Sequence, residues 1–221
     1  MDFVENISGE EIESLAVADF SGPIVVVSEP GEYFAEAIEY LQHQTVLGFD
    51  TETKPNFKSG VPHNEVAILQ LSGYDKAYIF RLIDLKMPPA LSKILSSESI
   101  IKVGAAIHDD IKGLRRYKEF TARGFVDLQK IGEDFGIKEK SVRKMAAIIL
   151  DKKVSKSQQL SNWEAPNLSG AQLKYAAIDA WICREMYVKL CDIDSTKCVP
   201  VKISTPKKNI DNKKRPYKKK K

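Results

Sequence analysis

The sequence predicts an α/β fold in which helices flank a mixed β-sheet, and three observations carry this prediction. Three β-rich runs follow one another with short connections, which favours an antiparallel meander. Further β-rich runs alternate with segments of helical periodicity, which is typical of parallel strands joined by helices. The 221 residues are 43% hydrophobic, so the chain can bury one core and is expected to form one main domain.

The order of the elements follows from the spacing of the apolar residues. Runs rich in β-branched and aromatic residues predict strands, and the turn-prone "GYD" divides the second and third strands of the meander. Strands are expected at residues 23–28, 45–52, 66–73, 77–84, 100–106 and 124–128. Helices are expected at residues 32–42 and 89–97, from residue 107 onward, and over most of residues 128–190.

Charge and composition predict three parts: an N-terminal extension (1–22), a folded domain (23–195) and a basic tail (196–221). Residues 202–221 hold ten Lys or Arg and one acid, whereas residues 1–201 carry a net charge of −5. A segment so charged and so poor in apolar residues is expected to be disordered. Three interpretations of the tail stay open: a solubilising terminus or purification artefact, a sequence-independent grip on phosphates, or a nuclear-import signal.

The cellular compartment is inferred from the cysteines and from the absence of targeting patterns. The start of the chain is acidic and lacks the pattern of a secretory signal, and no apolar stretch is long enough to span a bilayer. Cys183, Cys191 and Cys198 have no CxxC spacing, which favours free thiols in a reducing compartment. We expect a cytoplasmic protein, or a nuclear one if the source is eukaryotic, with no membrane contact. The sequence indicates no required protein partner and leaves the oligomeric state open.

One predicted strand ends in a pair of acids. In "TVLGFDTETKPNF", Asp50 and Glu52 are separated by one residue, and in a strand such residues point to the same side of the sheet. Adjacent carboxylates repel each other and are pushed toward protonation where water is partly excluded. A compensating positive charge is therefore expected beside them.

Two further acids fall on the buried faces of predicted helices. In "IHDDIKGL" the apolar stripe places Asp110 inward and Asp109 toward water. In "LKYAAIDAWICREMYVKL", Tyr175 and Asp179 are four residues apart and are neighbours on one face. Each residue alone is better explained by a helix cap, an ion pair or core packing. Together with the strand pair they make four inward acids without a matching Lys or Arg in their motifs, which predicts a site for Mg²⁺ or Mn²⁺.

These motifs resemble those of the DEDD superfamily of 3′–5′ exonucleases, of the DEDDy type, in the branch of ribonuclease D and the Werner-type exonucleases. The similarity covers about residues 45–190. The three motifs are Asp50-Thr51-Glu52, Asp110 within "KVGAAIHDDIKGL", and Tyr175-Ala176-Ala177-Ile178-Asp179. Glu164-Ala165-Pro166 stands where ribonuclease D often has Arg-Pro-Leu, so the resemblance does not imply an RNA substrate.

The resemblance implies a ribonuclease H-like exonuclease domain that releases nucleoside 5′-monophosphates from the 3′ end of DNA or RNA. It implies two divalent cations, Mg²⁺ or Mn²⁺, held by Asp50, Glu52, Asp110 and Asp179, with Asp50 shared between them. Tyr175 would orient the attacking water, because a phenol with a pKa near 10 is a poor base at neutral pH. These five residues form the predicted catalytic set.

The loop after the acid pair, "TKPNFKSGVPHNE", is interpreted equally as a solvated loop or as a substrate contact. In the second case Thr53, Lys54, Phe57 and Lys58 would bind nucleic acid, with the aromatic ring stacking on a base and the lysines on phosphates. "KGLRRYK" is a second candidate surface, although such a cluster is more often a solvated helix face. Trp163 is expected to be a packing anchor.

Two other functions stay open at the level of sequence: a non-catalytic nucleic-acid-binding module and a ribonuclease H-like endonuclease. The module is disfavoured, because the complete set of acids has no evident reason to be present without chemistry, and the endonuclease is given a similarly low weight. The sequence does not decide between DNA and RNA, or between a single strand and a recessed duplex end.

Overall fold

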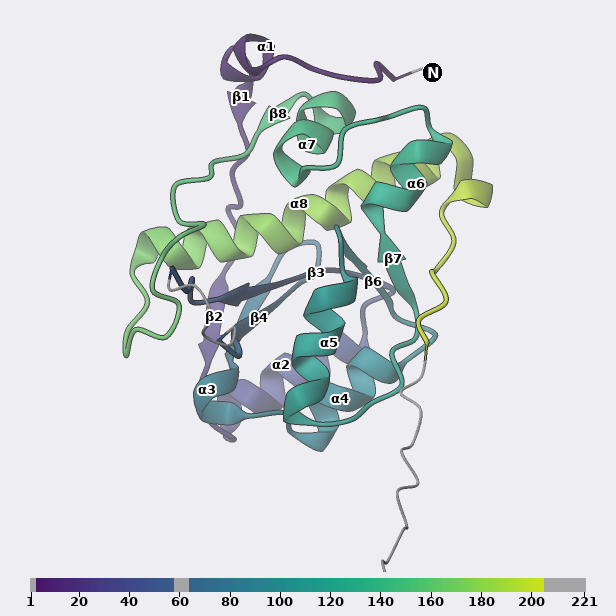
Figure 1. Ribbon diagram of the computed structural model, residues 1–221. Helices are drawn as coiled ribbons and strands as arrows, with labels where there is room; N and C mark the ends of the chain where they lie inside the picture. The colour runs from purple at the N-terminus through teal and green to yellow at the C-terminus, as the bar shows by residue number, and fades with distance from the viewer. Residues whose placement is uncertain (1–2, 58–63, 205–221) are drawn as a thin grey trace, which may run out of the picture.

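The computed structural model describes residues 3–57 and 64–204, and its centre is a six-stranded sheet (Figure 1). The strands lie in the order β2 (Ile24–Val27), β5 (Ala77–Arg81), β4 (Val66–Ser72), β3 (Val46–Thr53), β6 (Ile101–Gly104) and β7 (Phe125–Asp127). β3, β4 and β5 pair as an antiparallel meander. The remaining neighbours pair in parallel, so the predicted mixed sheet is confirmed.

Helices cover both faces of this sheet, as Figure 1 shows. α8 (Gly170–Asp194) lies across one face, and α2 (Glu32–Gln42), α4 (Pro89–Ser96) and α5 (His108–Tyr117) cover the other. Leu47 and Phe49 of β3 are fully buried in the core on the side of these three helices. Because side chains alternate along a strand, Gly48, Asp50 and Glu52 face α8.

The close approach of α8 to β3 depends on small residues. α8 begins with a capping box in which Ser169 and Gln172 bind each other's backbone N–H groups. Ala176, Ala177 and Ala180 of this helix are fully buried against the sheet. A Cβ atom on Gly48 would lie 1.8 Å from the carbonyl oxygen of Ala180, so only glycine allows this distance between strand and helix.

Two predicted strands are shorter than expected. The prediction of a strand at 77–84 is wrong after Arg81, where the chain turns into α3 (Leu82–Leu85). Leu82 and Leu85 are both buried three residues apart, which is a helical spacing within an apolar run. β6 ends at Gly104, because Ala106 has a φ of 57° and cannot continue the strand.

The segment predicted as mostly helix before residue 190 is interrupted. It contains α6 (Leu128–Asp134), α7 (Val142–Leu150) and the short strand β8 (Lys152–Lys153), followed by irregular chain over 154–169. α7 ends at Asp151, whose backbone takes the left-handed conformation with a φ of 55°. This irregular stretch places further polar side chains beside α8, as described below.

Both described ends of the chain pack on the domain. α1 (Gly9–Glu13) leads to β1 (Ala16–Val17), which pairs in parallel with β8, and the Ala18 and Phe20 that follow are buried. After the short 3₁₀ helix η1 (Ser195–Lys197), the Val201 N–H donates to the Phe125 carbonyl of β7 at 2.7 Å. The predicted basic tail (196–221) begins within the described chain at η1, and its residues 205–221 lie outside the described residues.

Within the described part of the chain, no helix combines the length and the apolar character needed to cross a membrane. Cys183, Cys191 and Cys198 are free thiols, as predicted. Trp163 is completely buried, which confirms that it is a packing residue.

Candidate active site

Three carboxylates meet between β3 and α8. Asp50 and Glu52 face α8 from the half-buried end of β3, and Asp179 lies one residue before Ala180, the alanine that contacts Gly48. One carboxylate oxygen from each of the three acids lies within 4.8 Å of the other two. The close packing at Gly48 therefore brings the acid of the third motif onto the acid pair of the first.

Burial raises the pKa values of all three acids, and repulsion between the carboxylates adds to the rise for Asp50 and Glu52. The pKa of Asp50 lies well above its usual range, because the carboxyl is desolvated and faces Asp179, Asp110 and Glu52. Desolvation, followed by the same neighbouring charges, raises the pKa of Glu52 to about 8. Desolvation also raises the pKa of Asp179 to about 7. Without a cation, the three groups cannot all be ionised at neutral pH.

Tyr175 lies one helical turn before Asp179 and donates a hydrogen bond to its carboxylate. Its ring packs against Trp163, with the ring centroids 6.0 Å apart. Desolvation, followed by the charges of Asp179, Glu52 and Asp50, raises the pKa of the phenol well above its ordinary value. The phenol therefore stays protonated at neutral pH and acts as a hydrogen-bond donor.

Asp110 approaches the cluster from the other side. It lies in the first turn of α5, and its carboxylate accepts a hydrogen bond from the hydroxyl of Thr51. Burial raises the pKa of Asp110 to about 6, and the Thr51 hydrogen bond opposes that rise. Its oxygens are not part of the group of three, although its charge contributes to the raised pKa of Asp50. Asp109 is exposed, so the predicted helix orientation is confirmed.

A cavity of about 350 Å³ opens over the three acids and Tyr175. Its opposite wall comes from α6, the N-terminal end of α7 and the irregular stretch after β8, and its polar residues are Gln129, Lys140, Ser141, Arg143, Ser155, Lys156 and Gln159. None of these residues was predicted from the sequence, because they belong to segments without a recognised motif. The signal available was the run "KVSKSQQ", whose alternation of lysine and polar residues resembles an ordinary loop.

The three cations in this wall have different partners. Lys140 forms an ion pair with Glu133, and Arg143 forms one with Glu13 of α1. Within the described chain, the Lys156 carbonyl accepts a hydrogen bond from the Gln159 N–H, but its side chain makes no ion pair or hydrogen bond, so its ammonium group is available to an anion in the cavity.

A second cavity of about 400 Å³ lies beside Asp110. It is lined by Thr51 and Thr53 of β3, Asn64, Val66, and by Asp109, Asp110, Lys112, Gly113 and Arg116 of α5. Lys112 and Arg116 are exposed and lie one helical turn apart. Carboxylates are thus flanked by a hollow on each side of β3, and each hollow carries basic residues on its rim.

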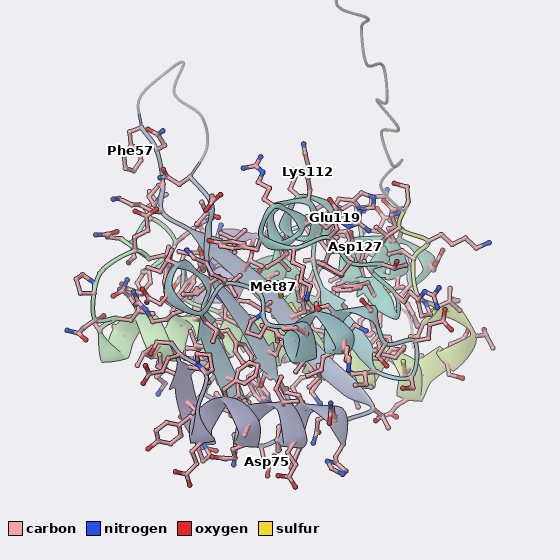
Figure 2. The ribbon with its side chains drawn as sticks, turned by 90° about the horizontal axis from the view of Figure 1, so that it is seen from below. Phe57, Asp75, Met87, Lys112, Glu119 and Asp127 are labelled. Carbon is pink, nitrogen blue, oxygen red and sulfur yellow. The ribbon has the colours of Figure 1, made fainter. Side chains whose placement is uncertain are left out.

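The predicted substrate residues are divided among different environments. Thr53 lines the second cavity, whereas Lys54 forms an ion pair with Glu164 at 3.1 Å. Phe57 is 79% exposed, and Figure 2 shows it on the same side of the molecule as Lys112. Lys58 lies outside the described residues, so its predicted role stays a prediction.

Known proteins are similar to this chain in sequence and in fold. A family model described as 3′–5′ exonuclease matches residues 25–193. Exonuclease 3′–5′ domain-containing protein 2 of Drosophila melanogaster is 34% identical over 160 residues, covering 71% of this chain and 27% of the relative. The exonuclease mut-7 homolog of Aedes aegypti is 29% identical over 179 residues, covering 70% of this chain and 24% of the relative. The chain spans about a quarter of the length of these two relatives.

Solved structures give the same result for the fold. The Nibbler EXO domain of Aedes aegypti superposes with a TM-score of 0.66 at 26% identity, covering 82% of this chain and 93% of that one. Ribonuclease D of Escherichia coli superposes with a TM-score of 0.67 at 19% identity, covering 78% of this chain and 44% of that one, and shows the ribonuclease H-like exonuclease fold. The chain therefore belongs to the 3′–5′ exonuclease family.

Proposed function

We propose that this protein is a metal-dependent 3′–5′ exonuclease that removes nucleoside 5′-monophosphates from the 3′ end of DNA or RNA. The observation that carries the proposal is the convergence of Asp50, Glu52 and Asp179 within 4.8 Å, beside Tyr175 and in an open cavity. Membership of the 3′–5′ exonuclease family supports the direction of hydrolysis.

The donor set fits a hard divalent cation. All candidate ligands are carboxylate oxygens, which suit Mg²⁺ or Mn²⁺, and their raised pKa values reflect desolvation together with a repulsion that a cation relieves. Asp50, Glu52 and Asp179 would hold one cation, and Asp50 with Asp110 would hold a second. Bound cations of this kind supply charge neutralisation and Lewis-acid chemistry for the hydrolysis of a phosphodiester.

Tyr175 would orient the attacking water as a hydrogen-bond donor. Its pKa is raised by burial and by the neighbouring carboxylates, so the phenolate needed for proton abstraction is inaccessible at neutral pH. Its ring is held by contact with the buried Trp163, which fixes the position of the hydroxyl. Both features favour positioning over general-base catalysis.

The basic residues around the acids would bind the phosphates on either side of the scissile bond. Lys156 faces the carboxylates across the first cavity, and Lys112 and Arg116 line the second. Cations at these places offset the repulsion between a nucleic-acid strand and an acidic site. A ribonuclease D of Trypanosoma brucei, 17% identical to this chain, has been solved in complex with the RNA U12, which supports a nucleic-acid substrate in general.

The test is to incubate the purified protein with 5′-labelled DNA and RNA oligonucleotides in the presence of Mg²⁺ or Mn²⁺. We expect a ladder that shortens from the 3′ end, with 5′-monophosphates as products and no cleavage in excess EDTA. A single internal cut would support a ribonuclease H-like endonuclease instead. Binding without cleavage would support a non-catalytic module. The Asp50→Asn variant, prepared in the same way, controls for contaminating nucleases.

A further inference from the structure

Gln70 lies in the middle of β4, directly opposite Asp50 in the antiparallel pairing with β3. Its neighbours along the strand, Leu69 and Leu71, are buried on the side of α2, α4 and α5, so the Gln70 side chain faces α8 together with Asp50. Only 1% of Gln70 is exposed to solvent. The glutamine therefore lies beneath the candidate active site and not on its surface.

The amide of Gln70 has no visible structural purpose. Neither Nε2 nor Oε1 has a hydrogen-bond partner among the described residues. On the side away from Asp50, its register partner is Ile79, which belongs to an apolar cluster with Trp163 and Ala176. A buried amide without a partner is destabilising, and an apolar side chain would fill this place at lower cost.

We propose that Gln70 is a positioning residue for the metal ligand Asp50, to whose carboxylate its Nε2 group donates a hydrogen bond when a divalent cation is bound. Side chains directly opposite each other in an antiparallel pair have Cβ atoms about 4.5–5.5 Å apart, which the amide of a glutamine can span. Gln70 has two register partners, Asp50 on one side and Ile79 on the other, and only Asp50 of these two is polar. The inference rests on the proposed metal-dependent function.

A hydrogen bond of this kind orients a metal ligand through a donor that does not itself contact the cation. A carboxylate has about four lone-pair sites, so Asp50 keeps free sites even when it is shared between two cations, and a donor on one of these sites fixes its rotation. Groups in such a position typically change metal affinity by about 10–100-fold when removed. The buried amide is then retained for the metal-loaded state, although it destabilises the metal-free state.

The experiment compares Gln70→Met with the wild type, because methionine has nearly the same shape as glutamine and no amide. Mn²⁺ binding to the full-length protein is titrated by electron paramagnetic resonance, and thermal unfolding is measured in EDTA. We expect Mn²⁺ to bind about 10-fold more weakly, while the melting temperature without metal stays the same or rises. Ser72→Ala is the matched control, since Ser72 is buried on the same face of β4 and its hydroxyl bonds, among the described residues, only to the Gly73 carbonyl. This control should bind Mn²⁺ as the wild type does.

Unchanged Mn²⁺ affinity in Gln70→Met would overturn the inference, and so would a lowered melting temperature with unchanged affinity, which is the signature of a purely structural residue. Gln70→Leu is the second variant if the first fails to fold. Failure of both to fold without metal would also overturn the inference, because the amide would then be needed by the fold. Failure of the proposed function is distinguishable, since the wild type itself would then neither bind Mn²⁺ nor shorten an oligonucleotide.

Discussion

The hydroxyl of Thr51 donates a hydrogen bond to the carboxylate of Asp110, and this contact joins the acidic strand to α5. β6 pairs with β3 only as far as Gly48, so the edge of β3 beyond that residue is open to the first turn of α5. Thr51 lies between Asp50 and Glu52 and points to the opposite side of the strand. The fourth acid therefore reaches the cluster around the edge of β3, while the other three meet on the face beneath α8.

This arrangement separates the two adjacent acids of α5. We expect Asp110→Ala to lose activity by more than about 100-fold, because the residue contributes its charge at the metal cluster. Asp109→Ala should keep nearly normal activity, since its side chain is exposed. The measurement is single-turnover cleavage of a labelled oligonucleotide by each variant. A reversed order of the two variants would show that Asp109, and not Asp110, serves the site.

Asp50→Asn should abolish turnover and preserve the fold. The residue is the shared ligand in the proposed site, and even groups behind metal ligands are worth about 10–100-fold in affinity or activity. The substitution also removes a charge from a buried cluster of acids, so the melting temperature in EDTA should stay the same or rise. Activity assays with Mg²⁺ and Mn²⁺ and thermal unfolding in EDTA check both statements. Near-normal turnover would remove Asp50 from the metal site.

The metal-free protein should lose stability as the pH rises from about 4 to about 8. Glu52 and Asp179 have folded-state pKa values raised to about 8 and about 7, so the folded state binds more protons than the unfolded state in this range. Their protonated forms therefore stabilise the fold at low pH, and this stabilisation is lost as each group ionises. The free energy of unfolding in EDTA, measured across this range, tests the sign.

Two comparisons isolate the acid cluster from other titrating groups. In Asp50→Asn the decline with pH should be shallower, because one source of repulsion is gone. Added Mn²⁺ should stabilise the wild type more at pH 8 than at pH 6, since cation binding competes with protons for the same oxygens. A pH dependence that is identical in wild type and variant would place its origin outside the cluster.

Gly48→Ala should destabilise the protein and displace α8. The added methyl group would overlap the carbonyl oxygen of Ala180, which is backbone and cannot move without the helix. Overpacking of this kind costs roughly 1–3 kcal/mol or more in the free energy of unfolding. Asp179 directly precedes Ala180, so a shift of α8 would also move this metal ligand, and the variant should bind Mn²⁺ more weakly. Gly9→Ala is the control, since nothing lies within 4 Å of a Cβ atom there, and it should behave as the wild type.

Deletion of residues 205–221 should weaken binding to long single strands and flatten its dependence on salt. This segment holds nine Lys or Arg residues, and each lost phosphate contact lowers the salt slope by about 0.7–0.9. Truncation at this point keeps the Val201 contact with β7 and the Ser204 carbonyl that accepts from Arg115. Binding isotherms at low and moderate salt test the prediction. The saturated rate on a short oligonucleotide should not change. Identical salt slopes for the full-length and truncated proteins would instead mean that the tail is a solubilising or targeting segment.

Local patterns in the sequence correctly predicted the strands, helices and inward-facing acids wherever the spacing of nearby residues determines the structure. The meander followed from three closely spaced β-rich runs, and the orientation of Asp110 and Asp109 followed from the apolar stripe of α5. The same patterns failed at 77–84, where apolar residues continue into a short helix, and at 154–169, where the chain is irregular and not helical. A helix of one turn and a left-handed residue such as Asp151 leave almost no periodic signal.

The sequence by itself therefore determined the mixed sheet, the two acids on one side of a strand and the helical phase of Tyr175 and Asp179. The tertiary structure alone decided which side chains from distant segments meet: Lys156 across the cavity from the acids, and Gln70 without a partner beside Asp50. The reason is physical. Periodicity reports which face of an element is buried, whereas the contact between elements depends on strand register and on the close approach of α8 at Gly48.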